Sequence, residues 1–200
     1  MRNVRYAAAL LLAVMSLAAR AEEGWYENVT PGHSGFFFHA ELGGSWLAPK
    51  AADQDRDLSF VGASSALGFG WSVSEEVVLG QEVWSSVGVD VEDTGAGRFV
   101  LIATGPMLRG YLDPGRANWF YSVTPSLTRL VVTSADGSST NSKFGGGVRV
   151  AIGKEWLRPP SRWGIGVAAQ FGYSSNRMSN GSDQTVSILT TGLNLSLTMN

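Results

Sequence analysis

The sequence contains no cysteine, which excludes disulfide bonds, thiolate catalysis and cysteine-based metal sites. It has only two histidines, and 16 % of its residues are charged, against about 25 % in typical soluble domains. Beyond the N-terminus, no apolar run approaches the roughly 20 residues that a membrane helix needs. If this chain spans a membrane, it must do so with β-strands.

The first residues have the pattern of a secretory signal peptide. Arg2 and Arg5 precede an apolar stretch over residues 7–18, and Ala19-Arg20-Ala21 forms a small-x-small cleavage site. Cleavage there removes three of the 15 basic residues and leaves twelve against 17 acidic ones, so a nucleic-acid partner is not expected. We predict three segments, namely a signal peptide (1–21), a periplasmic lead-in (22–34) and one domain (35–200).

The segment from Trp163 to Tyr173 shows most clearly how the rest of the chain is built. Its odd positions are all apolar or aromatic, whereas its even positions are small or polar. A period of two predicts a strand with two unlike faces. Similar alternation recurs over residues 36–47, 58–73, 76–87, 99–112, 119–130, 144–156 and 186–199.

The connections between these eight strands alternate in length. Three are tight, at residues 74–75, 113–116 and 158–162, and four are longer and polar, at about 48–57, 88–97, 133–141 and 175–183. Short turns on one rim and longer loops on the other are typical of outer-membrane barrels. We therefore predict an all-β protein, an eight-stranded antiparallel up-and-down transmembrane β-barrel.

The content of the polar face indicates which side of each strand points inward. That face consists mainly of glycine, alanine, serine and threonine, which suit the crowded interior of a narrow barrel. Four charged residues on the inward positions are predicted to form an ion-pair cluster in the lumen: Glu41, Glu82, Arg109 and Arg149. Arg129 and Lys154 fall on outward positions near the strand ends.

Aromatic residues near the strand ends are predicted to lie at the two membrane interfaces. They are Trp46, Trp71, Trp119, Tyr121, Trp156, Trp163 and Tyr173.

Two prolines do not suit a closed barrel. Pro106 and Pro125 lie inside predicted neighbouring strands, within about two residues of facing each other, and a proline has no N–H to donate to the ladder. We expect a bulge or a local break in pairing at this point. Two interpretations stay open, a simple adjustment of twist and a weak point in the wall through which a lipid passes.

The sequence does not predict a catalytic, cofactor or metal site. His33, Ser34 and Glu41 are the residue types of a hydrolase triad, but His33 and Ser34 are adjacent and share no strand face with Glu41. Acidic residues alternate in the first long loop (residues 53–57). Solvated acidic side chains explain this pattern more simply than a calcium site does.

The mature chain resembles the small eight-stranded outer-membrane barrels, similar to the transmembrane domain of outer membrane protein A. The resemblance rests on the signal peptide, the eight alternating strands, the aromatic strand ends and the small-residue interior with paired charges. The chain departs from that family's aromatic C-terminal residue, since it ends in Leu197-Thr-Met-Asn200. The resemblance implies the outer membrane as location, with outer-membrane lipid and the barrel-assembly machinery as partners.

We expect a monomer with a side-chain-filled lumen and a structural or adhesive role through four extracellular loops, not a diffusion pore. Two alternatives stay open, a lipid-binding or lipid-modifying barrel and a soluble periplasmic barrel that binds a small apolar ligand.

Overall fold

The computed structural model describes residues 35–51, 59–90, 97–112, 119–134, 136–157, 162–179 and 184–199. The predicted signal peptide and lead-in lie outside the described residues. Every regular element within these ranges is a strand. None of the described segments forms a helix long and apolar enough to cross a membrane.

Nine strands are labelled along the chain. They are β1 (Gly35–Ala51), β2 (Phe60–Ser72), β3 (Val77–Asp90), β4 (Arg98–Tyr111), β5 (Trp119–Thr133), β6 (Ser139–Asn141), β7 (Gly145–Leu157), β8 (Trp163–Arg177) and β9 (Thr185–Met199).

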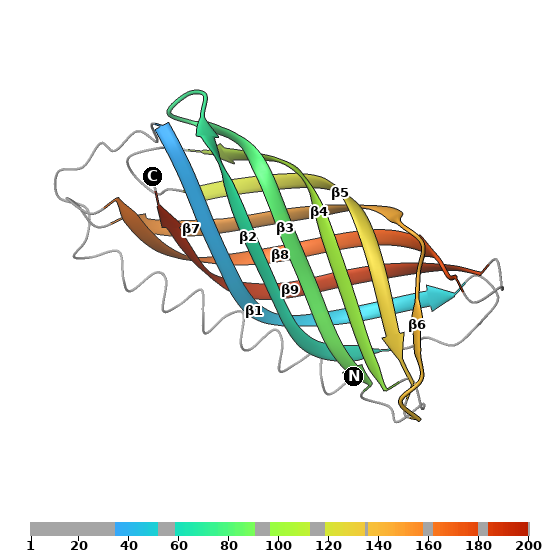
Figure 1. Cartoon of the computed structure of the whole chain (residues 1–200). Helices are drawn as coiled ribbons and strands as arrows, with labels where there is room; N and C mark the ends of the chain where they lie inside the picture. Colours follow the sequence, from blue (N-terminus) through green and yellow to red (C-terminus); the bar gives the residue numbers. More distant parts are fainter. Residues whose placement is uncertain are drawn as a thin grey trace. The chain divides into compact units, whose positions relative to one another are not determined.

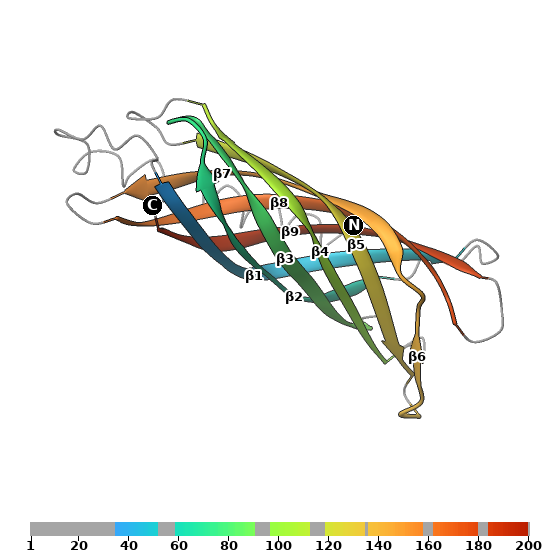
Figure 2. The same cartoon turned by 45° about the horizontal axis from the view of Figure 1, so that its top comes forward.

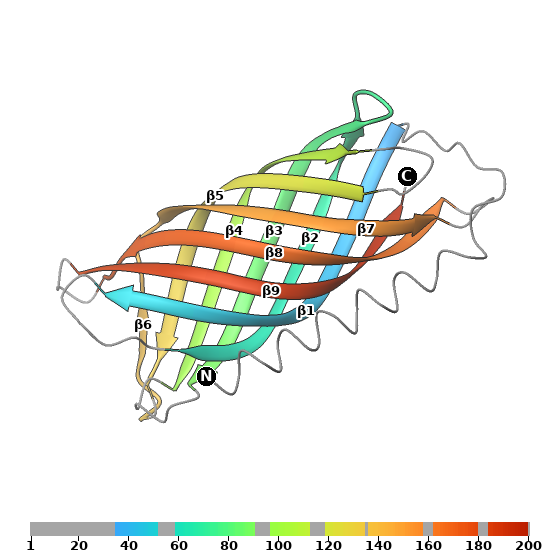
Figure 3. The ribbon, with the colours of Figure 1, turned by 180° about the vertical axis from the view of Figure 1, so that it is seen from behind.

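The strands form one closed antiparallel sheet. Each pairs with its sequence neighbour, β1 closes the ring against β9, and β5 pairs with β4 on one side and with β6 and β7 on the other. In Figure 1, β1 to β5 form the near wall, whereas in Figure 3 the wall of β7, β8 and β9 is in front. Because β6 is three residues long and lies in line with β7, the wall has eight strands, which confirms the predicted fold class.

Side chains alternate between the two faces of the wall, as the strand geometry requires. Along β8, the even residues from Gly164 to Gly172 are buried, while Trp163, Ile165, Phe171 and Tyr173 are exposed. The same parity places the glycine- and serine-rich face of every wall strand inside.

Several strands extend further than predicted, into the four longer connections. β1 continues to Ala51, β3 to Asp90 and β8 to Arg177. The predicted loop at 133–141 is largely a hairpin, in which the end of β5 pairs with β6 around a turn at residues 134–138. Figure 2 shows this hairpin projecting from one end of the wall. The prediction of a loop here was wrong because polar residues on both faces hide the alternation.

The pairing of β4 with β5 is interrupted at the two prolines, which confirms the expected local break. The ladder is continuous in register on both sides, from Arg98↔Thr133 to Thr104↔Leu127 and again from Leu108↔Val123, so there is no bulge. The same register sets Pro106 directly opposite Pro125. The Leu112 N–H donates to the Trp119 carbonyl, and the Pro106–Pro125 rung lies an even number of rungs from that pair. It is therefore a rung at which two ordinary residues would donate to each other. Both donors are absent there because both residues are proline.

The interior also contains two apolar layers, which were not predicted. One lies towards the short-turn end and consists of Phe37, Val78, Met107, Tyr111, Phe120 and Ala168. The other lies towards the loop end and consists of Leu47, Phe60, Ala66, Trp84, Phe99, Leu101, Ala103, Leu130, Met178 and Ile188. The inner face is therefore not uniformly small and polar, since large rings fill it at both ends.

Candidate functional site

A layer of charged side chains lies between the two apolar layers. Glu41 on β1, Glu82 on β3, Arg109 on β4 and Arg149 on β7 all point into the lumen and are almost completely buried. They occupy the inward positions of their strands, and the closed wall brings together residues up to 108 positions apart in sequence. We call this group, with His39 and Glu155, the charged layer.

Arg149 connects two of the carboxylates. Its Nη1 donates to Glu82 Oε2 over 2.9 Å, and its Nη2 donates to Glu41 Oε2. Its Nε donates to Gln170 Oε1 over 3.0 Å. One guanidinium therefore bridges β1, β3 and β8, and its planar set of donors suits such a fixed arrangement.

Arg109 forms the second centre of the layer. It pairs with Glu155 on β7, and its Nη1 lies 3.8 Å from Glu41 Oε1. The guanidinium carbon lies 3.6 Å from the centre of the Phe120 ring. Arg109 therefore also joins the charged layer to the apolar layer at the short-turn end. Glu155 accepts further hydrogen bonds from Tyr111 Oη (3.3 Å) and Thr198 Oγ1 (2.6 Å).

His39 completes the charge balance of the layer. Its Nε2 lies 3.2 Å from Glu82 Oε2, and its Nδ1 lies 3.6 Å from Glu41 Oε1. Carboxylate oxygens accept hydrogen bonds, so both ring nitrogens face acceptors, an arrangement that suits the doubly protonated imidazolium. Three carboxylates against two guanidiniums leave one negative charge, which a doubly protonated His39 would cancel.

Neutral polar side chains extend the network to the remaining strands. Asn194 on β9 donates to Glu41 Oε2 and Gln170 Oε1, each over 3.1 Å, and accepts from Ser64 on β2 over 2.7 Å. On β5, Ser126 accepts from the Trp84 indole over 3.0 Å. Charged and polar contacts therefore tie together all eight strands of the wall.

This arrangement can hold strands in register and exclude ions, but it is poorly suited to catalysis. The six ionisable groups of the charged layer face one another inside the barrel. A general base needs a proton to abstract from a substrate within hydrogen-bond reach, and here the carboxylates and the imidazole are paired with each other.

Of the residues considered for a hydrolase triad, the structure describes only Glu41. His33 and Ser34 lie outside the described residues, and Glu41 is occupied by Arg149, Arg109 and His39. The described ranges contain no group of three or more histidine, aspartate or glutamate residues arranged to hold a metal ion.

Six of the seven predicted interface aromatics point outward and are substantially exposed. Trp71, Trp119, Tyr121 and Trp163 lie towards the short-turn rim, and Trp46 and Tyr173 towards the loop rim. Trp156 occupies the outward row of β7 but is nearly covered, and Lys154 Nζ lies 5.9 Å from its ring and 5.7 Å from that of Trp119. Arg129 is outward and exposed, with its guanidinium 5.9 Å from the Phe144 ring.

Glu155 and His39 belong to the charged layer but were not among the four residues predicted for it. The signal for Glu155 was present, because residue 155 continues the odd-numbered inward row that contains Arg149. Nothing in the sequence predicted that both ring nitrogens of His39 face carboxylates. Glu82 lies 43 positions away in sequence and meets His39 only inside the barrel.

The wall is similar to those of several solved outer-membrane proteins. Neisserial surface protein A is 16 % identical, with 84 % of this chain and 99 % of that chain covered and a TM-score of 0.59. OprG from Pseudomonas aeruginosa is 10 % identical, with 86 % and 100 % covered and a TM-score of 0.54. The outer membrane protein AlkL is 12 % identical, with 89 % and 96 % covered and a TM-score of 0.50.

Neither the comparison with protein-family models nor that with curated protein sequences gave a match. The similarity to these solved structures shows that the chain has the fold of the small eight-stranded outer-membrane barrels. At these identities, the likeness extends to the fold alone.

Proposed function

We propose that this protein is an outer-membrane barrel with a closed lumen, which acts through its loop end in a structural or adhesive role. The observation that carries the proposal is the reversed polarity of the wall. Large apolar side chains such as Leu42, Leu67 and Leu195 are more than half exposed on the outside, while the charged residues are buried inside. Such a surface is unsuitable in water and suitable in a bilayer.

The height of the apolar surface agrees with a bilayer. Trp163 and Tyr173 are ten residues apart on β8, which corresponds to about 33 Å along the strand at about 3.3 Å per residue. With a strand tilt of about 40°, the vertical span is about 25 Å, the height of the apolar band in outer-membrane barrels. A surface of this height supports placement in the outer membrane and opposes the soluble periplasmic alternative.

The location is tested by fractionating cells that express the full chain. We expect the protein in the outer-membrane fraction, released only by detergent, with a faster gel mobility before boiling than after it. Release from the periplasm without detergent would contradict the membrane placement, whatever the role of the loops.

A closed lumen is supported by the three filled layers. The Phe37 and Phe120 rings, the charged layer and the Leu47, Phe60 and Phe99 side chains are all buried at successive levels. Purified protein in planar bilayers is expected to give no large steady conductance, because ions have no hydrated path. A steady ohmic current from the folded protein would contradict this part of the proposal.

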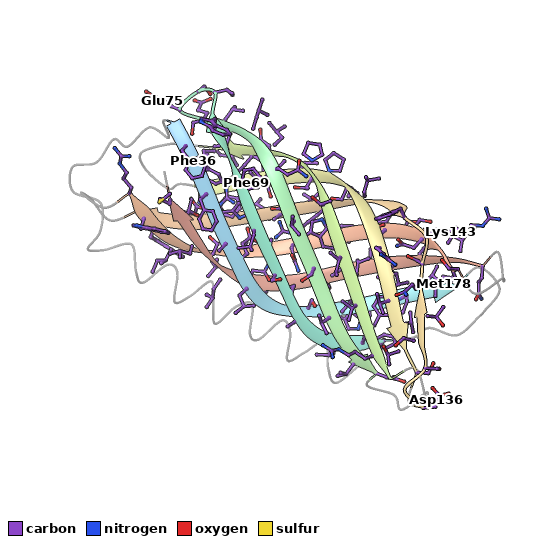
Figure 4. The ribbon with its side chains drawn as sticks, viewed as in Figure 1. Phe36, Phe69, Glu75, Asp136, Lys143 and Met178 are labelled. Carbon is purple, nitrogen blue, oxygen red and sulfur yellow. The ribbon has the colours of Figure 1, made fainter. Side chains whose placement is uncertain are left out.

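The adhesive or structural role is assigned to the loop end because the strands continue there beyond the apolar surface. β5 and β6 form a paired hairpin at this end, with Asp136 at its tip (Figure 4). A peptide tag inserted after Asp136 should bind antibody on intact cells. Replacing the 134–138 turn with a two-residue Asn-Gly turn should lower cell attachment while leaving heat-modifiable mobility unchanged.

A tag that is reached only in lysed cells would show the opposite orientation. Unchanged attachment after shortening the hairpin would remove this loop from the proposed role.

A further inference from the structure

Basic side chains cluster on the outside of the wall at the loop end. Arg129 on β5, Lys143 between β6 and β7 and Arg177 on β8 are all exposed. They come from neighbouring strands, since β5 pairs with β7 and β7 with β8. The Lys143 N–H donates to the Arg177 carbonyl over 2.8 Å, so these two residues are immediate neighbours across the wall.

An aromatic ring lies within this cluster. Phe144 is 75 % exposed, more than the other large apolar residues on the described surface, and its ring lies 5.9 Å from the Arg129 guanidinium. A break in the ladder brings these residues to the surface. Between the rungs Thr128↔Gly145 and Val131↔Asn141, β5 has two residues where the opposite side has three. The extra residue forms a bulge that turns both Lys143 and Phe144 outward, and Figure 4 shows Lys143 pointing away from the barrel.

The cluster begins where the apolar surface ends. Arg129 follows Leu127, which is 64 % exposed, at the next outward position of β5. On β8, Arg177 lies four residues beyond the interface aromatic Tyr173, about 13 Å further along the strand at about 3.3 Å per residue. If the aromatic row marks the edge of the hydrocarbon region, these cations lie at the level of lipid head groups.

The electrostatic surroundings of Arg129 and Lys143 favour an anion. Among the described residues, the outward positions of β5, β7 and β8 carry no aspartate or glutamate. The nearest described acid on the hairpin is Asp136, which lies in the turn beyond the end of β5. Its carboxylate accepts hydrogen bonds from Ser138, which lower the pKa of Asp136 and hold it in place at the tip.

We propose that Arg129, Lys143 and Arg177, with Phe144 between them, bind the phosphate groups of lipid A, the phosphorylated glycolipid of the outer leaflet. This inference rests on the proposed outer-membrane placement and deepens it by naming the lipid. Guanidinium and ammonium groups match phosphate oxygens, and the exposed ring contacts the acyl chains or sugar just below them. A free phosphate ion offers the same charge but makes no contact with Phe144.

The experiment compares three ligands on the refolded full chain in detergent micelles. They are lipid A, lipid A with its phosphates removed, and inorganic phosphate. We expect lipid A to bind, the dephosphorylated form to bind about tenfold more weakly or worse, and inorganic phosphate to bind weakly, because each cation at a lipid surface contributes about fivefold in affinity.

The test variant is R129Q/K143Q, and the matched control is K50Q. Lys50 is an exposed cation at the same rim on β1, on the opposite side of the eight-stranded wall from β5. Lipid A affinity should fall about tenfold or more in R129Q/K143Q and remain unchanged in K50Q. The charge-preserving variant R129K/K143R should retain binding, which shows that the loss is not caused by misfolding.

Three results would overturn the inference: undiminished binding by R129Q/K143Q, an equal loss in K50Q, which indicates diffuse attraction, or equal affinity for inorganic phosphate. Heat-modifiable mobility in phosphatidylcholine vesicles is measured in parallel. If the wild-type barrel inserts there without preferring lipid A, the inference fails and the proposed function stands. If it does not insert at all, the proposed function fails.

Discussion

Gly68 makes room for the imidazole of the charged layer. It lies directly opposite His39 in the β1–β2 ladder, and a Cβ atom at residue 68 would overlap His39 Nε2, the atom that faces Glu82. A methyl group there must push the ring away from its carboxylate. We expect G68A to lower the free energy of unfolding by about 1–3 kcal/mol, the usual cost of overpacking. The measurement is urea unfolding in lipid vesicles, followed by tryptophan fluorescence.

Gly146 provides the matched control for this substitution. It also lies in a wall strand, but a Cβ there meets no atom within 4 Å. G146A should be neutral or slightly stabilising, because alanine restricts the unfolded chain more than glycine does. Equal destabilisation by both variants would show that the cost comes from the backbone and not from His39.

Most of the stability that Arg149 contributes is expected to come from neutralising the carboxylates with which it pairs. In R149M, Glu41 and Glu82 lose their closest cation while remaining buried, and breaking a buried pair in this way costs about 3–5 kcal/mol. Adding E82Q removes one of the two unpaired charges, so R149M/E82Q should be more stable than R149M alone. The check is a double-mutant cycle from urea unfolding. Additive effects of the two changes would show that Arg149 and Glu82 do not interact.

At the level of residues, the sequence predicted which face of the wall a side chain points to, but not which residue it pairs with. Parity alone placed Glu41, Glu82, Arg109 and Arg149 inward, because a strand turns every second side chain to the same face. It did not predict that Arg109 pairs with Glu155, because partners across a lumen depend on strand order, tilt and side-chain reach together. Parity also did not reveal the inward aromatic rings, since an apolar residue on the inner face looks like a register error.

At the level of elements, the weakest rung of the wall is the proline pair. The two missing N–H donors leave the carbonyls of residues 106 and 125 without their ladder partners, and β4–β5 pairing is absent over three rungs. The strands nevertheless stay close together, because a Cβ at Gly105 would overlap the Pro125 carbonyl oxygen. Behind the gap, the Trp84 indole donates to Ser126, so the inner side is filled.

Replacing both prolines with valine should therefore stabilise the barrel. Each new N–H completes one hydrogen bond, worth about 0.5–1.5 kcal/mol, so P106V/P125V should gain about 1–3 kcal/mol in the free energy of unfolding. Each single variant should gain about half. The measurement is again urea unfolding in vesicles. A second readout is quenching of Trp84 by brominated lipid, in a background in which the other six tryptophans are replaced by phenylalanine.

The quenching separates the two interpretations of the gap. A twist adjustment predicts that Trp84 is equally protected from lipid in the wild type and in P106V/P125V. A lateral opening predicts quenching in the wild type that disappears in the variant. Lower stability in P106V/P125V would instead show that the backbone at this rung is shaped for proline.

The strands themselves were predictable because their two faces meet such different surroundings. Each wall strand was found within a few residues, and the tight turn before Val77 was placed correctly. The strands that run into the longer loops, β1, β3, β5 and β8, end further along the chain than predicted. Beyond the apolar surface both faces of a strand meet polar surroundings, so residues such as Ser139 and Thr140 carry no alternation even though they are paired.

At the scale of the whole molecule, the charged layer is one of three successive layers of buried side chains inside the wall. This arrangement makes a specific prediction for E41Q/R149Q, which removes two of the central charges. The apolar layers around Phe37 and Phe120 at one end and Leu47 and Phe60 at the other remain in place. An ion would have to lose its hydration shell to pass them, which costs far more than thermal energy.

We therefore expect E41Q/R149Q to be less stable than the wild type yet equally silent in planar bilayers. The control is R162Q, an exposed residue at the short-turn rim, which should match the wild type in both stability and conductance. Only protein with heat-modifiable mobility is recorded, so that unfolded chains do not contribute. A steady conductance in E41Q/R149Q would mean that the charged layer alone seals the barrel. It would also mean that the apolar layers move aside on the timescale of ion passage, and that the closed lumen depends on the ion pairs among β1, β3, β4 and β7.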